Sequence, residues 1–447
     1  MVTRQEKIRW SIGSFILCLA LVCLIFPVSI NAADKATIKV GVLGPIKFLT
    51  GQHLWWGAQL AADEINNAGG VDVKGVKHKI ALVKADTNEY QSVPDAINAA
   101  EKLISIRKVD ILLGGQRSEA VLAIQEIMAD NRIIFMNCGS SHPLQCARVA
   151  KDYDRYKYFF RGAHINSPDM GKVNFASIGM VAGTVRRQLG IKKPRVAAIV
   201  EKAKWSEPIV AMLPKMFPKM GLEYIGVWQP SHMAIDATAE LSAIRSAKAH
   251  MIVTFINGPA GIAVSRQWGE LKVPSALVGI NVESMKQGQW KATHGRCNYE
   301  ATIDWYGRVK MTDRTIPFYD KFVKRFGEFP IFIANAYDGL YILKEAIERA
   351  GTLDSDALVV ELEKTDYTGA IGRIVFRPKG DPLPHDSMWG PGYFTALGKQ
   401  WRDGKLLVVW PDGRAALGDK RWEKIRYEGT VDYVLPPWML EYWKGKK

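Results

Sequence analysis

Cysteine is scarce in this chain, and its scarcity excludes one class of fold. Only five cysteines occur among 447 residues, and two of them, Cys18 and Cys23, lie in an apolar run near the N-terminus. A small scaffold held together by disulfides therefore does not fit, and the fold must depend on buried apolar cores. The length favours two lobes, since domains usually run about 100 to 200 residues.

The glycine-rich motifs that hold phosphate are absent. Gly41, Gly44 and Gly51 follow a predicted strand, but they lack the G-x-G-x-x-G spacing, and no Lys-Ser or Lys-Thr pair follows Gly51. Those residues are what let the backbone close on phosphate oxygens. A dinucleotide or nucleoside triphosphate site is therefore not expected in this loop.

A block of basic residues is also missing. Lys and Arg number 60 against 45 Asp and Glu, a formal net charge of +15, but the cations are spread along the chain. A nucleic-acid site needs them gathered on one face or stripe. No nucleic-acid partner is expected, and the charge indicates a solvated basic surface.

Three cysteines lie outside the N-terminal run: Cys138, Cys146 and Cys297. Cys138 and Cys146 are close enough in sequence to close a loop by a disulfide in an exported chain, with Cys297 left over. Cys138, His142 and Cys146 also recur at intervals of four. No second ligand pair accompanies them, so neither a metal ion nor another cofactor is expected.

Long apolar runs are confined to the N-terminus. Three basic residues precede a charge-free stretch over 10–33, whose most apolar part is 12–26. The small residues near Ala32 and Ala33 predict cleavage of residues 1–33 as a signal peptide, which would place the chain in the periplasm. An uncleaved anchor is the alternative, because the run is long enough to span a bilayer.

After this run, strands and helices alternate twice along the chain. Alternation at this spacing is typical of parallel sheets with helices on both faces, so we expect an α/β fold with two Rossmann-like lobes. The strands of the first series are expected at 38–42, 80–83, 111–113 and 133–136, and those of the second at 195–200, 222–227, 251–255 and 276–278.

Four loops at strand ends carry small polar residues. They are "GGQRSEA" (114–120), "NCGSSHP" (137–143), "FINGPAG" (255–261) and "VGINVES" (278–284). Ligands of open parallel sheets bind beyond the carboxyl ends of the strands, and two of these loops come from each series. They predict a cleft with one lobe on each side, although Ser118 is equally well explained as a helix cap.

Several blocks together identify a resemblance. The segments "IKVGVLGPIKFLTG", "GAQLAADEINNAGGV", "ILLGGQRSEAVLAIQEI", "RIIFMNCGSS", "YFFRGAHINS" and "AYDGLYILKEAIERAG" resemble the leucine/isoleucine/valine-binding protein family. These are type I periplasmic solute receptors of ABC importers for branched-chain amino acids, amides and urea-like solutes. The resemblance covers roughly residues 36–380.

The resemblance implies a periplasmic binding protein type I fold, with two lobes hinged by three crossover segments. Lobe 1 is expected at 34–160 plus about 283–365, and lobe 2 at 161–282 plus about 366–411. It further implies a monomer without enzymatic activity, which closes on a small-molecule ligand and presents the closed form to a membrane permease. The alternatives are a ligand-sensing ectodomain and an exported hydrolase that uses Ser140 or Cys138 with His142.

The family's ligand-holding positions are matched one by one. The carboxylate-holding serine corresponds to Ser118, beside Arg117, and the next loop contributes Cys138, Gly139 and Ser140. The rings expected on the ligand are Trp55 or Trp56 from the first lobe and Trp205 from the second. Asn257 stands where an aromatic residue is common.

Asn281 departs from the family pattern. It stands where amino-acid-binding members carry the acid that receives the ligand ammonium. Asn offers no charge to compensate a buried ammonium, unless a shift of the loop lets Glu283 substitute. An amide, or an aromatic or aliphatic acid held by Arg117 and Ser118, therefore suits these residues at least as well as a simple α-amino acid, and all three ligand classes stay open.

The C-terminal part extends beyond the family's usual length. Six of the fourteen tryptophans follow residue 385, and residues 412–447 are basic and aromatic. This extension is expected to wrap across the lobes and bury its rings.

Overall fold

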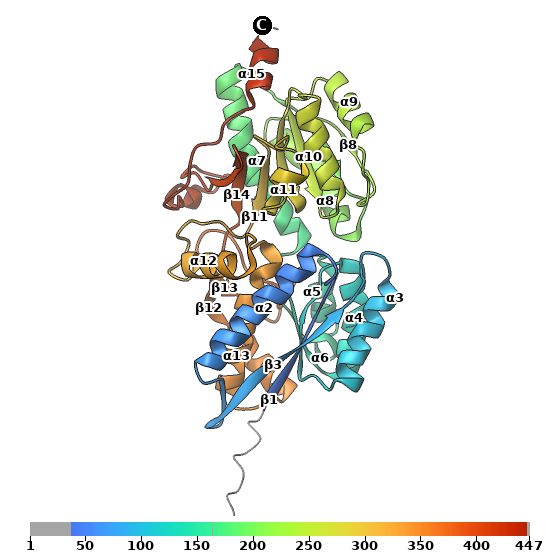
Figure 1. The fold of residues 1–447 in the computed structure, drawn as a ribbon, viewed down its shortest axis with the longest axis vertical. Helices are drawn as coiled ribbons and strands as arrows, with labels where there is room; N and C mark the ends of the chain where they lie inside the picture. Colours follow the sequence, from blue (N-terminus) through green and yellow to red (C-terminus); the bar gives the residue numbers. More distant parts are fainter. Residues whose placement is uncertain (1–36, 163, 445–447) are drawn as a thin grey trace, which may run out of the picture.

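The structure, a computed structural model, describes residues 37–162 and 164–444, and the proposed signal peptide lies outside them. Two lobes lie one above the other, each built on its own sheet (Figure 1). This arrangement confirms the two-lobed α/β fold expected from the sequence.

The lower lobe contains a six-stranded sheet with the order β2-β3-β1-β4-β5-β6. All neighbours are parallel except the short β2, which pairs antiparallel with β3. The central β4 and β5 are fully buried, as their continuous apolar sequences predict for strands covered on both faces. The strands are β1 (Thr37–Gly44), β2 (Val71–Val73), β3 (Val76–Asp86), β4 (Ile111–Gly114), β5 (Ile134–Asn137) and β6 (Phe159–Arg161).

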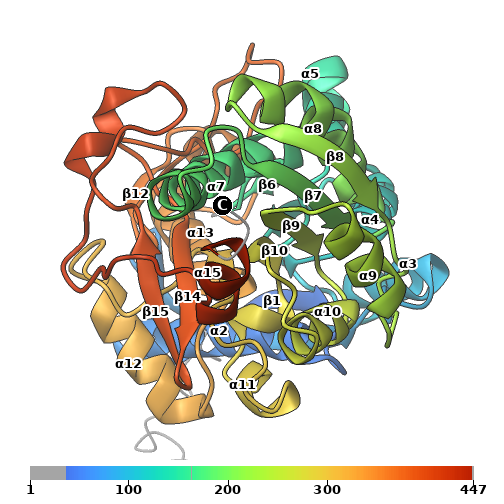
Figure 2. The same cartoon turned by 90° about the horizontal axis from the view of Figure 1, so that it is seen from above.

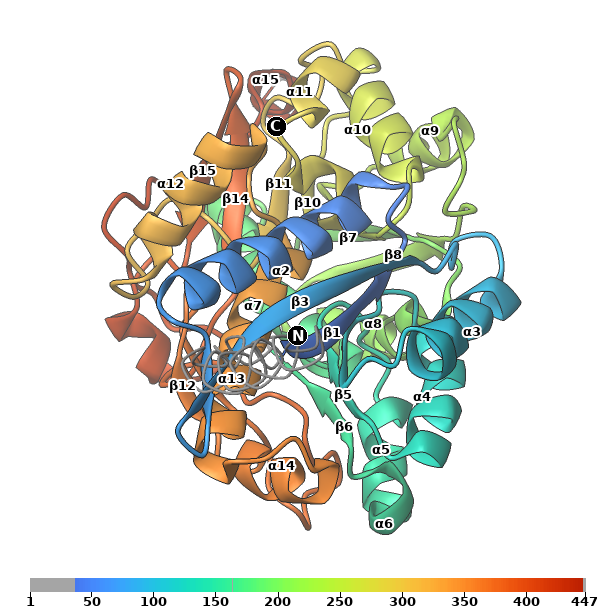
Figure 3. The same ribbon diagram turned by 60° about the horizontal axis from the view of Figure 1, so that its bottom comes forward.

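Helices cover both faces of this sheet. Figure 3 shows α2 and α13 on one side of β1 and β3, and α3 and α4 on the other. The helices of the lobe are α2 (Leu49–Asn67), α3 (Val93–Glu101), α4 (Ser118–Asn131), α5 (Leu144–Lys151), α6 (Tyr153–Tyr156), α12 (Thr315–Phe326), α13 (Ala336–Ala350) and α14 (Ser355–Leu362).

The upper lobe contains a seven-stranded sheet with the order β15-β14-β11-β10-β9-β7-β8 (Figure 2). All neighbours are parallel except β14, which runs antiparallel to both β11 and β15. The strands are β7 (Arg195–Val200), β8 (Glu223–Trp228), β9 (Met251–Ile256), β10 (Ala276–Asn281), β11 (Ala301–Asp304), β14 (Leu397–Arg402) and β15 (Lys405–Trp410). The helices are α7 (Ser167–Leu189), α8 (Glu207–Lys219), α9 (Thr238–Ser246), α10 (Ala260–Glu270), α11 (Gln289–Ala292) and α15 (Pro437–Lys444).

The chain crosses between the lobes three times, at about 162–166, 305–314 and 376–396. Buried ion pairs join these crossovers. Arg161 contacts Asp386 at 2.5 Å, which links the first crossover to the third. Lys399 on β14 contacts Asp304 on β11 at 2.6 Å, and these two strands adjoin the third and the second crossover.

The pairing of strands differs from the expected lobe boundaries in two places. β11, expected in lobe 1, is hydrogen-bonded to β10 and β14 in the upper sheet. β12 (Asp366–Thr368) and β13 (Arg373–Val375), expected in lobe 2, form a separate hairpin, and the N–H of Ala370 in its loop donates to Asp338 of α13. Strands of three or four residues give too weak a periodic signal to place from sequence.

The C-terminal extension packs on the upper lobe. The indole N–H of Trp438 donates to the carbonyl of Val273 at 3.0 Å, and that of Trp443 to Pro274 at 2.6 Å. Trp438 also meets Trp268 edge to face. The rings are therefore shielded as expected, but these contacts lie on one lobe rather than across both.

The disulfide expected between Cys138 and Cys146 is not formed. Both thiols are free and buried, as is that of Cys297. Cys138 lies against Gly339 of α13, whereas Cys146 on α5 lies in the field of Arg161 and Asp386. The two side chains therefore enter different parts of the core, and burial raises the pKa of each thiol far above its usual range.

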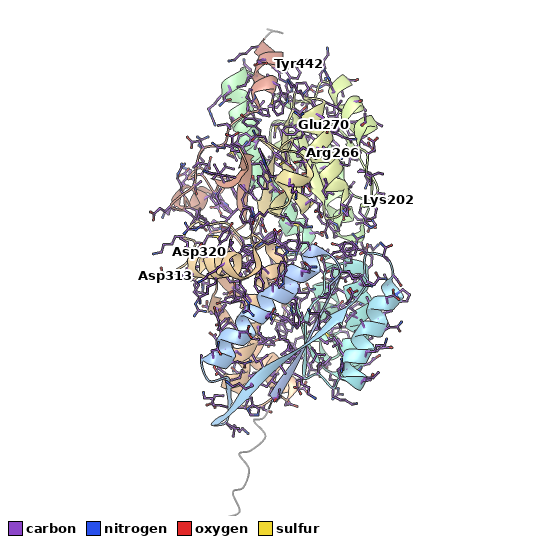
Figure 4. The ribbon with its side chains drawn as sticks, viewed as in Figure 1. Lys202, Arg266, Glu270, Asp313, Asp320 and Tyr442 are labelled. Atoms are coloured by element: carbon purple, nitrogen blue, oxygen red, sulfur yellow. The ribbon has the colours of Figure 1, made fainter. Side chains whose placement is uncertain are left out.

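Charges of both signs are distributed over the outer surface. Arg266 and Glu270 on α10 pair at 3.9 Å, and Asp313 and Asp320 lie at the edge near α12 (Figure 4). None of the helices among the described residues 37–162 and 164–444 has the length and apolar character of a membrane span.

Candidate functional site

The two lobes meet at the carboxyl ends of their parallel strands. Polar contacts that cross the junction include Arg117 with Glu201 at 3.3 Å, Gln116 with Asn257 at 3.1 Å, and the backbone N–H of Lys204 with Glu119 at 3.0 Å. The described conformation is therefore closed, with the lobes in direct hydrogen-bonded contact.

A cavity lies between the lobes at this junction, with an empty volume of about 390 Å³ that includes its opening. The part of it that admits a water-sized sphere is only about 30 Å³, below the usual range for small-molecule sites, so the walls lie close together in the described conformation. It is lined by Gln116, Gly139, Ser141, His164, Met170, Trp205, Asn257, Ile280, Val282, Met285, Trp305 and Phe332.

The lining is apolar and aromatic with few polar groups. His164 is its one titratable side chain, and burial lowers the pKa of His164 to about 3, so the imidazole is neutral at physiological pH. His164 Nδ1 and Trp305 Nε1 are buried without a hydrogen-bond partner among the described residues. The lining therefore offers neutral polar groups and carries no carboxylate.

The loop after β5 presents residues on both sides of the cavity wall. Gly139 lines the cavity, and a Cβ there would lie 2.7 Å from Ile333. Ser140 is fully buried behind the wall, where its hydroxyl bonds to that of Ser118 at 3.1 Å and accepts from Gln145. Ser141, which sequence reasoning did not single out, is the serine that lines the cavity.

Ser118 and Cys138 likewise stay behind the wall. Ser118 opens α4, and its hydroxyl accepts the N–H of His142 at 3.3 Å. The Cys138 thiol lies 3.7 Å from the carbonyl oxygen of Met136. Neither lines the cavity.

Trp55 and Trp56 are part of α2 rather than of the loop before it, and neither lines the cavity. Lys84 Nζ lies 4.1 Å from the ring centroid of Trp55, and Trp56 stacks on Phe326 of α12. The ring that the first lobe does contribute is Phe332. Gly57 of α2 makes this approach feasible, since a Cβ there would lie 2.3 Å from the carbonyl oxygen of Ala334.

The second lobe places its predicted residues in three environments. Trp205 and Asn257 line the cavity. Asn281 is fully buried behind it, where its amide donates to Ser265 at 2.9 Å and to Glu300 at 2.8 Å. Glu283 pairs with Lys286 at 2.7 Å beside a neighbouring hollow. Neither Asn281 nor Glu283 lines the cavity.

Sequence reasoning missed the ring residues of the crossovers. His164 lies in the first crossover and Trp305 at the start of the second, and their rings are 5.2 Å apart. No periodicity marks such residues, because they lie outside regular strands and helices. The concentration of aromatic residues at 153–164 was the one available signal.

Comparisons with known proteins agree with this architecture. A family model described as periplasmic binding protein matches residues 37–391. Leu/Ile/Val-binding protein homolog 7 of Brucella abortus is 23% identical over 400 residues, which cover 86% of this chain and 94% of the relative. Homolog 8 of Brucella melitensis is 21% identical over 408 residues, 89% of this chain and 96% of the relative.

Solved structures share the fold. The leucine-binding protein LivK of Thermotoga maritima aligns with a TM-score of 0.68 at 22% identity, over 84% of this chain and 99% of its own. A solute-binding protein of R. palustris in complex with benzoate aligns with a TM-score of 0.66 at 16% identity, over 86% of this chain and 100% of its own. With the family model spanning most of the chain, these findings show that the protein belongs to the periplasmic binding protein family.

Proposed function

We propose that the protein is the solute-binding component of an ABC importer of the branched-chain amino acid and amide type. It would act as a monomer in the periplasm, close on a small solute between its lobes and deliver it to a membrane permease. Family membership and the interlobe cavity support this proposal.

The ligand we propose is a small aromatic or apolar solute with one polar end, such as benzoate or its amide. The observation that carries this choice is the composition of the cavity wall. Trp205, Trp305 and Phe332 offer ring faces, while no carboxylate is available to receive an ammonium group. A buried ammonium without a counter-charge is strongly unfavourable, so an α-amino acid fits this wall poorly.

A carboxylate would find its partners in neutral groups. Arg117, expected to hold it, is already paired with Glu201, and Ser118 with Ser140. The remaining candidates are Ser141, the indole N–H of Trp305 and the backbone at Gly139, because the amide nitrogen of Gln116 already donates to Tyr90 and Asn257. Since such donors serve a carboxylate and an amide oxygen alike, the choice between acid and amide is left to the binding experiment.

The test is a thermal-shift screen of residues 34–447 against benzoate, benzamide, leucine, phenylalanine and urea. A ligand at about 100 times its Kd stabilises the folded state by roughly 2.7 kcal/mol. We expect benzoate or benzamide to raise Tm and the two amino acids to leave it unchanged. A rise with leucine or phenylalanine but with neither benzoate nor benzamide would overturn the proposed ligand class.

A matched pair of tryptophan variants locates the binding. Trp205→Ala removes a ring that lines the cavity, whereas Trp55→Ala removes one that packs outside it. We expect the first variant to abolish the ligand-induced shift and the second to retain it. Equal loss in both variants would place the ligand elsewhere.

We infer that the protein is not an enzyme. The hydroxyl of Ser140 is buried and held by Ser118 and Gln145, and His142 accepts the N–H of Leu144 at 3.2 Å. Turnover of esters or amides that disappears in Ser140→Ala would restore the hydrolase alternative. An N-terminal mass that retains residues 12–26 would favour the sensor.

A further inference from the structure

One buried acid outside the cavity wall occupies a central position between the lobes. Glu201 follows β7 directly and is fully buried. Its Oε1 accepts the indole N–H of Trp205 at 2.7 Å and lies 3.3 Å from the Arg117 guanidinium. Its Oε2 accepts the backbone N–H groups of Asn257 at 2.8 Å and Gly258 at 2.9 Å.

These donors come from different lobes. Trp205, Asn257 and Gly258 belong to the same lobe as Glu201, so their three hydrogen bonds are kept when the lobes separate. Arg117 belongs to the other lobe and supplies the cation in the closed form. A carboxylate removed from water needs both hydrogen bonds and a compensating positive charge. Closure of the lobes supplies that charge, because it brings Arg117 to Glu201.

The same carboxylate oxygen serves the cavity wall and the lobe contact. The ring of Trp205 lines the cavity, and its N–H is bonded to Oε1, the atom nearest Arg117. A solute packed on this ring restricts the ring, and thereby restricts the oxygen that Arg117 must meet.

A second path joins the same groups. Gln116, next to Arg117, lines the cavity and donates to the side-chain oxygen of Asn257 at 3.1 Å. The backbone of Asn257 donates in turn to Glu201. Two adjacent residues of the lower lobe thus meet one connected set of hydrogen bonds in the upper lobe, with Glu201 at its centre.

We propose that Glu201 is the positioning residue that couples solute binding at Trp205 to lobe closure by Arg117. This inference rests on the proposed solute-binding function but concerns a residue that does not line the cavity. It requires that the effect of substituting Trp205 on ligand affinity depend on whether Arg117 is present. It also requires that this dependence vanish when Glu201 loses its charge.

The experiment measures closure and binding separately. Spin labels at Glu101→Cys on α3 and Ala239→Cys on α9, both exposed and on opposite lobes, report the open and closed populations by double electron–electron resonance (Figure 1). Benzoate is the probe ligand, and its Kd is obtained by calorimetry. Because Cys138, Cys146 and Cys297 are buried, the protein without added cysteines serves as the labelling control.

The variants are Trp205→Phe, which keeps a ring and removes the N–H, Arg117→Gln, and the two combined. Each single change should weaken benzoate binding about tenfold, the effect of losing a hydrogen bond to a charged group. The double variant should be little worse than either single one. If the two factors multiply instead, the residues act independently and the proposal is overturned.

Glu201→Gln in combination with these variants tests the mediator itself. In proteins that carry Glu201→Gln, Trp205→Phe should change the Kd for benzoate by the same factor whether residue 117 is Arg or Gln. The matched control is Glu207→Gln, which neutralises an exposed acid that pairs with Lys204 nearby. If Glu201→Gln does not fold, the cycle between Trp205 and Arg117 still decides the question.

Failure of this coupling is distinguishable from failure of the proposed function. Arg117→Gln should lower the closed population even without ligand, which the spin labels detect whether or not benzoate binds. An unchanged population would remove Arg117 as a closure contact. Absence of benzoate binding to the wild type, with the population shift intact, would reject the ligand class alone.

Discussion

At the residue scale, burial changes the chemistry of acids near the junction. Glu89 is buried beside the loop of Gln116 and Arg117, and burial raises the pKa of Glu89 to about 8 despite the nearby cation. Glu300, under Asn281, has its pKa raised by burial to about 7. Both groups retain in the folded state a proton that an exposed glutamate releases near its ordinary pKa of 4.5.

Glu89→Gln should therefore change the pH dependence of stability. Between pH 4.5 and about 8 the folded wild type binds more protons than the unfolded chain, so this residue makes stability fall as pH rises. Gln removes that dependence. Relative to the wild type, the unfolding free energy of the variant should therefore increase as the pH rises through this window, by a few kcal/mol at its upper end. Urea unfolding at a series of pH values measures this difference. A difference that does not vary with pH would contradict the raised pKa.

Asn281→Ala should act on stability rather than on the ligand. The change removes bonds to Ser265, Gly261 and Glu300 and leaves buried polar atoms without partners. We expect a loss of about 2 to 4 kcal/mol in unfolding free energy, with the Kd for benzoate little changed. A large loss of affinity at unchanged stability would return Asn281 to the ligand site.

At the scale of elements, the crossovers are held by charge in the core. Lys399 on β14 and Asp304 on β11 have 3% and 0% of their side-chain surface exposed. Burial raises the pKa of Asp304, and its carboxylate also accepts the backbone N–H of Trp305, whose ring lines the cavity. The pair therefore connects the packing of the hinge with the wall of the site.

Lys399→Met should destabilise the protein by about 3 to 5 kcal/mol, because it leaves the acid buried and uncompensated. Adding Asp304→Asn removes the stranded charge and keeps an acceptor for Trp305. The double variant should recover most of the loss in chemical unfolding. No recovery would mean that the cost comes from packing of the Lys399 side chain.

At the scale of the whole molecule, the C-terminal extension completes the upper lobe. Trp438 and Trp443 cover the Val273–Pro274 segment on the side of the sheet away from the lower lobe (Figure 1). The closing motion and the stability of this lobe should therefore be separable.

Removal of residues 436–447 should lower Tm while leaving benzoate affinity unchanged. The truncation exposes Trp268 and leaves two backbone carbonyls without their indole donors. A loss of about 3 kcal/mol or more is expected, comparable to deleting one buried tryptophan. Differential scanning calorimetry and calorimetric titration check the two quantities, and a loss of affinity at unchanged Tm would indicate that the extension acts on the cleft.

The alternation of strands and helices was sufficient to determine the two α/β lobes, and the strand-end loops located the cavity. Each of the four predicted loops supplies lining residues: Gln116, Gly139 with Ser141, Asn257, and Ile280 with Val282. These two predictions succeeded because hydrophobic periodicity and the positions of loops follow from local sequence. The loops then meet at the cavity because the carboxyl ends of parallel strands lie at the same edge of a sheet.

Tertiary structure decided which side chain of each loop faces the cavity. Ser141 lines it while Ser140 lies behind. Phe332 replaces the expected Trp55 and Trp56 because Gly57 lets α2 approach the short 3₁₀ helix η4 (Phe332–Asn335). His164 and Trp305 meet only because two crossovers lie side by side. Such choices depend on loop backbone angles and on contacts between residues far apart in sequence, which no local pattern encodes.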